Sequence, residues 1–144
     1  MWARSEVAAE AARHRDLVPE APLYVELPGP QGEPTYLEGS IDLLCHDHLV
    51  PPADQTAFAV DYKTGGSASE TPERLQEKHL LQATCYAYAV LAQGYAAAEL
   101  AFVRVQQRDR EHPDQPQTVR YRFEHGQLQE LAERIRDAYA RRAG

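Results

Sequence analysis

The chain has 144 residues, 43% of them hydrophobic, and a formal net charge of −7 at pH 7. This length suits one compact domain that buries about two-thirds of its unfolded surface around one core. Domains held to nucleic acid mainly by their own phosphate contacts are usually basic, so the acidic balance argues against a simple nucleic-acid-binding protein. No apolar run approaches the roughly 20 residues of a membrane span, and the N-terminus lacks a signal-peptide pattern, so we expect a cytoplasmic protein without membrane contact.

The first half of the chain predicts a short helix followed by three antiparallel strands. Residues Ser5 to Leu17 carry alanines and charges at helical density, and the helix is expected to stop before Pro19. Alternating polar and apolar residues, separated by turns rich in proline and glycine, then predict the strands. These strands are Leu23 to Leu27, Thr35 to Cys45 and Ala57 to Lys63.

The second half predicts a helix, two strands and a final helix. Thr71 and Pro72 signal the start of a long helix that ends before Gly94. The later elements are two strands, Leu100 to Gln106 and Thr118 to Glu124, and an amphipathic helix, Leu128 to Arg142. This order predicts an α/β fold with a single mixed β-sheet flanked by α-helices.

The third expected strand is an apolar run that ends in an acid and a base. Period-two alternation places Asp61 and Lys63 on one face and Tyr62 on the other. Taken alone, the two charges would be read as an exposed ion pair worth at most about 1 kcal/mol. Asp42 could cap a turn, but it lies inside an alternating strand, which makes that role awkward. We therefore test whether Asp42 and Asp61 hold a divalent metal with Lys63 beside them.

Three motifs occur in an order that is similar to that of a known family. They are Gly39-Ser-Ile-Asp42, Val60-Asp-Tyr-Lys-Thr-Gly65 and Gln82-Ala-Thr-Cys-Tyr86. Together they resemble the motifs of the RecB-like branch of the PD-(D/E)XK nuclease superfamily, which includes the nuclease domains of RecB and AddA helicase–nucleases. The resemblance covers about Tyr24 to Val105, and three ordered motifs are far more specific than one Asp-x-Lys. It implies a restriction-endonuclease-like fold.

The resemblance implies catalytic and metal-binding roles. Asp42 and Asp61 would coordinate Mg²⁺ or Mn²⁺, together with the backbone carbonyl of Tyr62. Such hard cations prefer oxygen ligands. Lys63 would position the nucleophile and stabilise charge in the transition state.

The resemblance also implies supporting residues. Gln82 and Tyr86 are four apart, hence neighbours on one helical face, and the similar helix in relatives packs beside the metal site. Glu26 resembles a glutamate that precedes the second strand in many relatives.

A zinc site is a competing reading of Cys45-His-Asp-His48, because residues two apart on a strand share a face. Cys45 would point away from the two histidines, however, so we favour a solvated strand end. Cys45 and Cys85 have the spacing of neither a disulfide framework nor a zinc site or iron–sulfur cluster, so we expect small buried hydrophobes and no iron–sulfur cluster.

We read residues 1–144 as a single nuclease domain. Many relatives carry an additional histidine ligand in an upstream helix, and His14 is the sole candidate here, close in sequence to Asp42. We therefore expect a C-terminal fragment of a larger helicase–nuclease that lacks this helix. A helicase domain in the same parent chain and a second subunit are the expected protein partners.

The function expected from the resemblance is a Mg²⁺-dependent deoxyribonuclease, acting as an exonuclease on DNA ends in recombination and repair. An alternative is a catalytically inactive nuclease-fold module that binds DNA or serves as a scaffold in a helicase complex. A third reading is an RNA-directed or mobile-element nuclease of the same fold.

Overall fold

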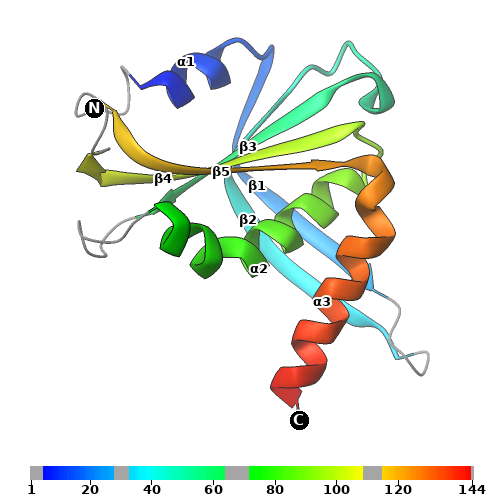
Figure 1. Ribbon diagram of the computed structural model, residues 1–144. Coiled ribbons are helices and arrows are strands. Elements are labelled where there is room, and N and C mark those ends of the chain that lie inside the picture. Colours follow the sequence, from blue (N-terminus) through cyan, green and yellow to red (C-terminus); the bar gives the residue numbers. More distant parts are fainter. Residues whose placement is uncertain (1–4, 28–32, 64–71, 109–114, 144) are drawn as a thin grey trace.

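The computed structural model describes residues 5–27, 33–63, 72–108 and 115–143. The strands lie in one mixed sheet in the order β1-β2-β3-β4-β5 (Figure 1). The pairing of β3 with β4 is parallel and the others are antiparallel. The elements are α1 (Glu6–Ala12), β1 (Asp16–Leu27), β2 (Thr35–His46), β3 (Thr56–Lys63), α2 (Pro72–Leu91), β4 (Ala97–Arg108), β5 (Pro116–Glu124) and α3 (Leu128–Ala143). The expected mixed sheet with flanking helices is confirmed.

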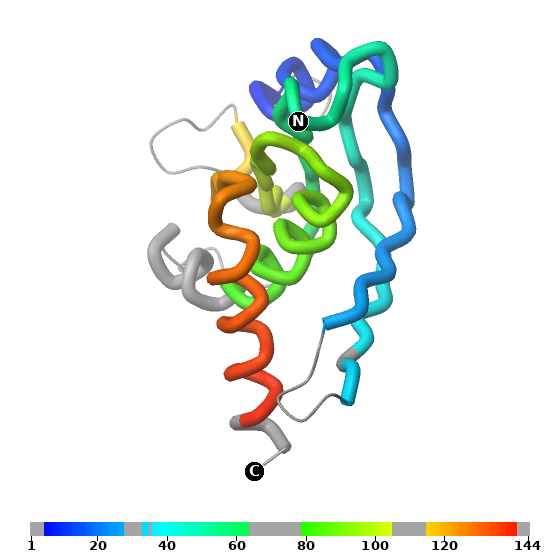
Figure 2. Tube along the Cα trace, turned by 90° about the vertical axis from the view of Figure 1, so that its right-hand side faces the viewer, coloured from blue at the N-terminus to red at the C-terminus, as the bar shows by residue number. Residues whose placement is uncertain are grey.

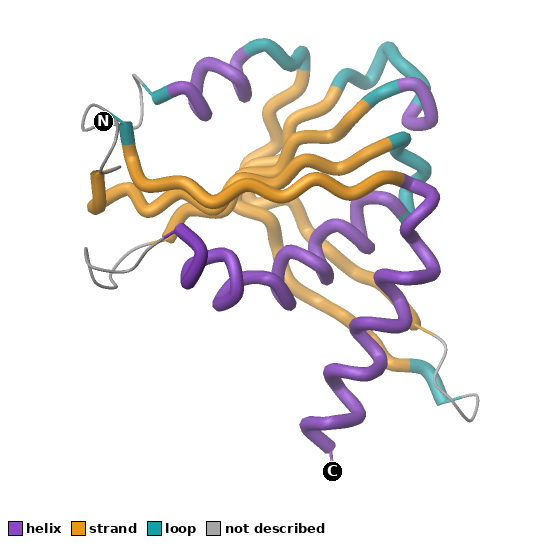
Figure 3. The backbone as a smooth tube through the Cα atoms, in the orientation of Figure 1, coloured by secondary structure: helices purple, strands orange, loops and turns teal. Residues whose placement is uncertain are grey.

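The helices cover opposite faces of the sheet, with α1 on one side and α2 and α3 on the other (Figure 3). Ser5 caps α1 by accepting a hydrogen bond from the backbone N–H of Ala8 at 3.0 Å, and Val7 and Ala11 pack against Phe58 of β3. Helix α2 connects the parallel strands β3 and β4 and packs against β4, β5 and α3. Within the described residues, no helix combines the length and apolarity that crossing a membrane requires.

Strands β1 and β2 extend beyond the sheet as a two-stranded arm. They pair over nearly their whole length, whereas β2 pairs with β3 only from Leu43↔Val60 to Cys45↔Phe58. The outer part of the hairpin therefore separates from β3 and runs beside α3 (Figure 2). Leu27 of this arm is buried against Ile135 of α3. The fork between β2 and β3 is the feature that positions the candidate site.

The first strand differs most from the expectation. Helix α1 ends at Ala12, and β1 already begins at Asp16, where we had expected helix to Leu17 and strand only from Leu23. Cross-strand pairing of 16–19 with 43–46 outweighs the local helical density of the sequence. Pro19 is accommodated because β1 is an edge strand of the sheet. Strand β4 likewise begins earlier, at Ala97, because buried alanines give little sequence signal for a strand.

Candidate active site

Two carboxylates meet where β2 and β3 separate. The ladder between these strands ends at Leu43↔Val60, so the next position in register would join Asp42 to Asp61. Here Asp42 Oδ2 accepts a hydrogen bond from the backbone N–H of Tyr62 at 2.8 Å. Asp61 is buried, with 7% of its surface exposed. The fold thus brings together acids that lie far apart in the sequence.

The electrostatics of this pair favour an additional cation. The pKa of Asp61 is raised to about 6, chiefly by burial and next by hydrogen bonding with the Asp42 carboxyl, while Lys63 opposes the rise. Apart from its ion pair with Lys63, Asp61 Oδ2 has no hydrogen-bond partner within the described part of the chain. Carboxylate oxygens that are crowded, buried and incompletely satisfied form a donor set that suits Mg²⁺ or Mn²⁺.

Lys63 is held by groups from two elements. Its Nζ lies 2.8 Å from Asp61 Oδ2 and donates a hydrogen bond of 2.8 Å to Gln82 Oε1 on α2. Gln82 Nε2 in turn donates to the Tyr86 hydroxyl at 2.8 Å. This amide orientation follows from chemistry, because an ammonium group only donates and must face the amide oxygen. A polar chain therefore runs from Asp61 through Lys63 and Gln82 to Tyr86.

Tyr86 remains a neutral phenol at physiological pH. Burial raises its pKa to about 12, and the negative charge of Asp61 adds to this effect. The structure thus brings together Asp42, Asp61, Lys63, Gln82 and Tyr86, all of which the sequence singled out. For Tyr62, the contact shown at the site is its N–H bonded to Asp42.

Phe102, which no sequence motif marks, lies under this chain. Phe102 pairs with Asp61 in the parallel β3–β4 register and is 2% exposed. The Lys63 Nζ lies 5.6 Å from the centre of its ring, and the Tyr86 ring stacks on it at 6.3 Å. No local motif marks this position, because the crossover through α2 sets which β4 residue lies beside Asp61.

The structure does not bring Glu26 to the carboxylate pair. Glu26 is exposed and lies opposite Tyr36 on the arm. The glutamate at the register position of Asp42 is Glu20, between the pairs Pro19↔Leu43 and Ala21↔Ile41. Glu20 has a φ of 49°, a left-handed conformation that is uncommon for residues other than glycine. The sequence could identify Glu20 as the residue at the register position of Asp42 only if the length of the turn between β1 and β2 were known, because that length sets the register.

His14 lies on the other side of the sheet. Its ring stacks on Phe58 with centroids 5.9 Å apart, and Phe58 belongs to the apolar cluster that α1 covers. Asp61 and Lys63 face α2 instead. The structure therefore separates His14 from the carboxylate pair.

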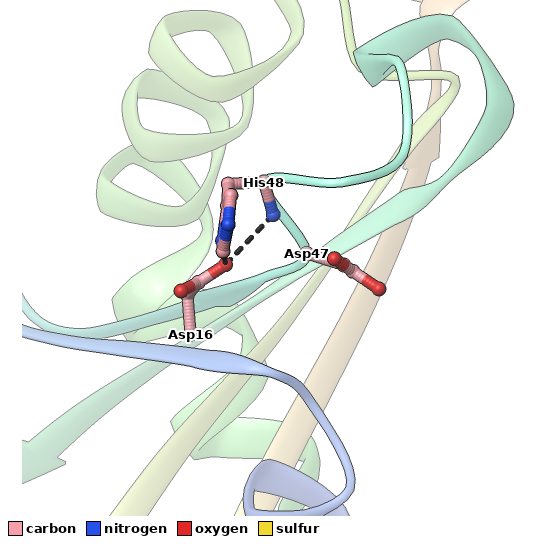
Figure 4. A group of neighbouring side chains, drawn as sticks. All are labelled: Asp16, Asp47 and His48. Atoms are coloured by element: carbon pink, nitrogen blue, oxygen red, sulfur yellow. Dashed lines mark hydrogen bonds and ion pairs between the residues drawn. The ribbon is translucent and has the colours of Figure 1, made fainter.

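A second group of possible metal ligands lies at the far end of β2. One ligand atom from each of Asp16, Asp47 and His48 lies within 4.8 Å of the others. Figure 4 shows the His48 ring over Asp16 and the Asp47 side chain directed away from both. Asp16 Oδ2 accepts hydrogen bonds from His48 N at 2.7 Å and Nδ1 at 2.8 Å, while Asp47 Oδ1 pairs with Arg15 at 3.2 Å. These hydrogen bonds and the ion pair explain why the three side chains lie close together in this turn.

The zinc reading of this segment fails at Cys45. That side chain is fully buried beside Val60, and burial raises the pKa of its thiol to about 12. His48 is exposed and bound to Asp16. The expectation of a buried hydrophobic cysteine is confirmed for Cys45, and Cys85 is partly buried beside α3.

A comparison with protein families matches residues 1–143 to the PD-(D/E)XK nuclease superfamily. The matched region includes the whole fork and the polar chain on α2. A comparison with curated proteins finds no match.

Proposed function

Because the chain belongs to the PD-(D/E)XK nuclease superfamily, we propose that it is a metal-dependent deoxyribonuclease of the RecB-like branch. The observation that carries this proposal is the fork itself. Asp42 and Asp61 converge there, and Lys63 is fixed beside them. Two acids and a lysine in this arrangement are suited to phosphodiester hydrolysis.

The metal in this proposal is Mg²⁺ or Mn²⁺, held by Asp42, Asp61 and the carbonyl of Tyr62. The buried and incompletely satisfied Oδ2 of Asp61 supports this choice. When bound, such an ion polarises a phosphodiester and lowers the pKa of a coordinated water.

Lys63 contributes a compact positive charge that can contact a phosphate oxygen and stabilise the charge that develops there. Gln82 and Tyr86 do not need to touch the substrate to matter. Their hydrogen bonds hold the ammonium in one place, so that little reorganisation is needed during the reaction.

We propose that DNA is brought to this site by another part of a larger assembly. The charge of −7 disfavours approach to DNA. Several described arginines are also engaged with carboxylates, in the pairs Arg15–Asp47, Arg120–Glu10, Arg122–Glu99 and Arg134–Glu130. A helicase domain in the same parent chain, or a second subunit, would supply affinity and direct the nuclease to DNA ends as an exonuclease in the cytoplasm.

The direct test is cleavage of end-labelled linear DNA, circular DNA and RNA with Mg²⁺, Mn²⁺ or EDTA. We expect shortening of linear DNA that requires the metal and is abolished by Asp61→Asn and Lys63→Ala. Asp54→Asn changes an exposed acid in the turn before β3 and serves as the matched control.

Cleavage that persists in Asp61→Asn and Lys63→Ala would contradict the assignment of the site. Absence of cleavage by the parent protein, measured together with DNA binding, would support the inactive binding module instead.

A further inference from the structure

We propose that Phe102 is a positioning residue for Lys63, whose aromatic face holds the ammonium group in its reactive position. This inference rests on the proposed nuclease function. It concerns how the lysine is held, which the acid pair and the polar chain explain only in part.

The described contacts of the ammonium leave one donor available. Lys63 Nζ has three N–H groups, and the oxygens within bonding distance in the described region are Asp61 Oδ2 and Gln82 Oε1, both at 2.8 Å. The Phe102 ring centre lies 5.6 Å from Nζ, inside the range of a cation–π interaction. A ring attracts the cation without taking up an N–H, so the third donor can serve a phosphate oxygen.

The Phe102 ring is itself firmly fixed. The His79 ring stacks on it at 5.2 Å with an interplanar angle of 11°, and the Tyr86 ring at 6.3 Å with the same angle. The Tyr121 ring of β5 meets it edge-on at 5.6 Å and 89°. Offset-stacked and edge-to-face contacts of this kind stabilise aromatic clusters beyond the burial of area. A ring packed this way presents a rigid surface to the ammonium.

Phe102 also joins the two halves of the site. It lies beside Asp61 in the sheet register, and it contacts Tyr86, which orients Gln82. Of the two groups that bind Lys63, the Asp61 carboxylate therefore lies beside Phe102, and the Gln82 amide is linked to the ring through Tyr86. Loss of the ring should disturb the lysine while leaving the carboxylate pair in place.

The test replaces Phe102 by 3,4,5-trifluorophenylalanine, which keeps the shape of the ring and weakens its negative face, and by leucine, which removes the ring. Phe123→Leu is the matched control, because Phe123 is buried in the same core cluster but has no contact with Lys63 among the described residues. We expect kcat for DNA cleavage to fall about 2- to 30-fold in both Phe102 variants. KM and Mn²⁺ affinity by calorimetry should stay within about twofold.

An unchanged kcat in the trifluorinated protein would overturn the proposal. So would loss of Mn²⁺ affinity in that protein, because the ring would then support the carboxylates and not the lysine. The fluorinated variant keeps the test valid even if Phe102→Leu fails to fold.

A second readout does not depend on cleavage. The chain contains two lysines, Lys63 and Lys78, so lysine labelled with ¹³C gives few signals, and Lys63→Arg assigns them. We expect the Lys63 ε-methylene protons to be shifted upfield by the ring and to move toward ordinary values in Phe102→Leu, but not in Phe123→Leu. An ordinary Lys63 shift in the native protein would refute the contact. An upfield shift without DNA cleavage by the parent protein would leave the contact standing and refute the nuclease function.

Discussion

Asp42 Oδ2 accepts a hydrogen bond from the N–H of Tyr62 at 2.8 Å, directly beyond the last pair of the β2–β3 ladder. The Asp42 side chain thus takes the backbone donor of Tyr62 at the point where the strands part. This contact fixes one acid beside the other, and the polar chain from Asp61 to Tyr86 begins there.

Metal binding should stabilise the protein through Asp42 and Asp61. The turn group at the end of β2, formed by Asp16, Asp47 and His48, should not contribute. With Mn²⁺ at about 100 times its Kd, the gain is about 2.7 kcal/mol, which corresponds to a Tm increase of about 6–10 °C. We expect Asp42→Asn and Asp61→Asn to abolish this increase and His48→Ala to retain it. Thermal unfolding with and without Mn²⁺ measures the difference. If the increase in Tm disappeared only in His48→Ala, the metal would bind at the turn group, and the proposed site at Asp42 and Asp61 would be wrong.

In the metal-free protein, the Asp61 carboxylate should be destabilising at neutral pH. Its folded pKa of about 6 lies above the ordinary value of 3.8, so the neutral form is favoured in the native state. The stability associated with this group is present below about pH 4 and lost as the pH rises through about 6. Asp61→Asn should therefore raise the free energy of unfolding by about 1 kcal/mol at pH 7.5 in EDTA, after allowance for the lost Lys63 pair.

The gain from Asp61→Asn should shrink as the pH falls from 6 to 4, because the native carboxyl then becomes neutral as well. Asp54→Asn removes the same charge at an exposed position and should leave stability nearly unchanged. Urea unfolding of the three proteins across this range is the measurement. A gain that does not depend on pH would point to altered packing.

The polar chain on α2 predicts graded effects on cleavage. Tyr86→Phe keeps the ring on Phe102 but removes the acceptor of the Gln82 amide, so single-turnover cleavage should slow about 3- to 10-fold. Gln82→Ala should slow it more, because Lys63 loses a direct partner.

The double variant should resemble Gln82→Ala alone, since both changes act through one chain. Gln93→Ala is the control, because in the described structure that side-chain amide, in the turn just after α2, bonds only to the carbonyl of Ala89. Independent, multiplying effects of Tyr86→Phe and Gln82→Ala would show that the two residues act separately.

Glu20 should be replaceable by glycine with a gain in stability. Its φ of 49° suits glycine, and relief of this conformation is worth about 1 kcal/mol. Glu26→Gly, in the extended part of the same strand, should cost stability instead. Chemical unfolding of both variants compares them. Destabilisation by Glu20→Gly would indicate that the Glu20 side chain makes contacts that outweigh its backbone strain.

Much of the fold followed from local patterns, because strand alternation and helical periodicity are local properties. The strand that ends at Lys63 and the long helix that ends at Leu91 have nearly the expected bounds. The start of β1 was wrong, because the chain near Leu17 looks helical locally and becomes a strand only through pairing with β2. The spacing of Gln82 and Tyr86 predicted their contact, since residues four apart on a helix are neighbours.

The sequence by itself singled out the groups that we propose carry the chemistry: Asp42, Asp61, Lys63 and the pair Gln82 and Tyr86 on α2. Only the tertiary structure decided what surrounds them. Phe102 lies under Lys63 because the parallel crossover through α2 sets the β3–β4 register. Glu20, and not Glu26, lies at the register position of Asp42 because the hairpin sets the β1–β2 register. Side-chain chemistry and short spacings are encoded locally, whereas register depends on pairing between distant segments.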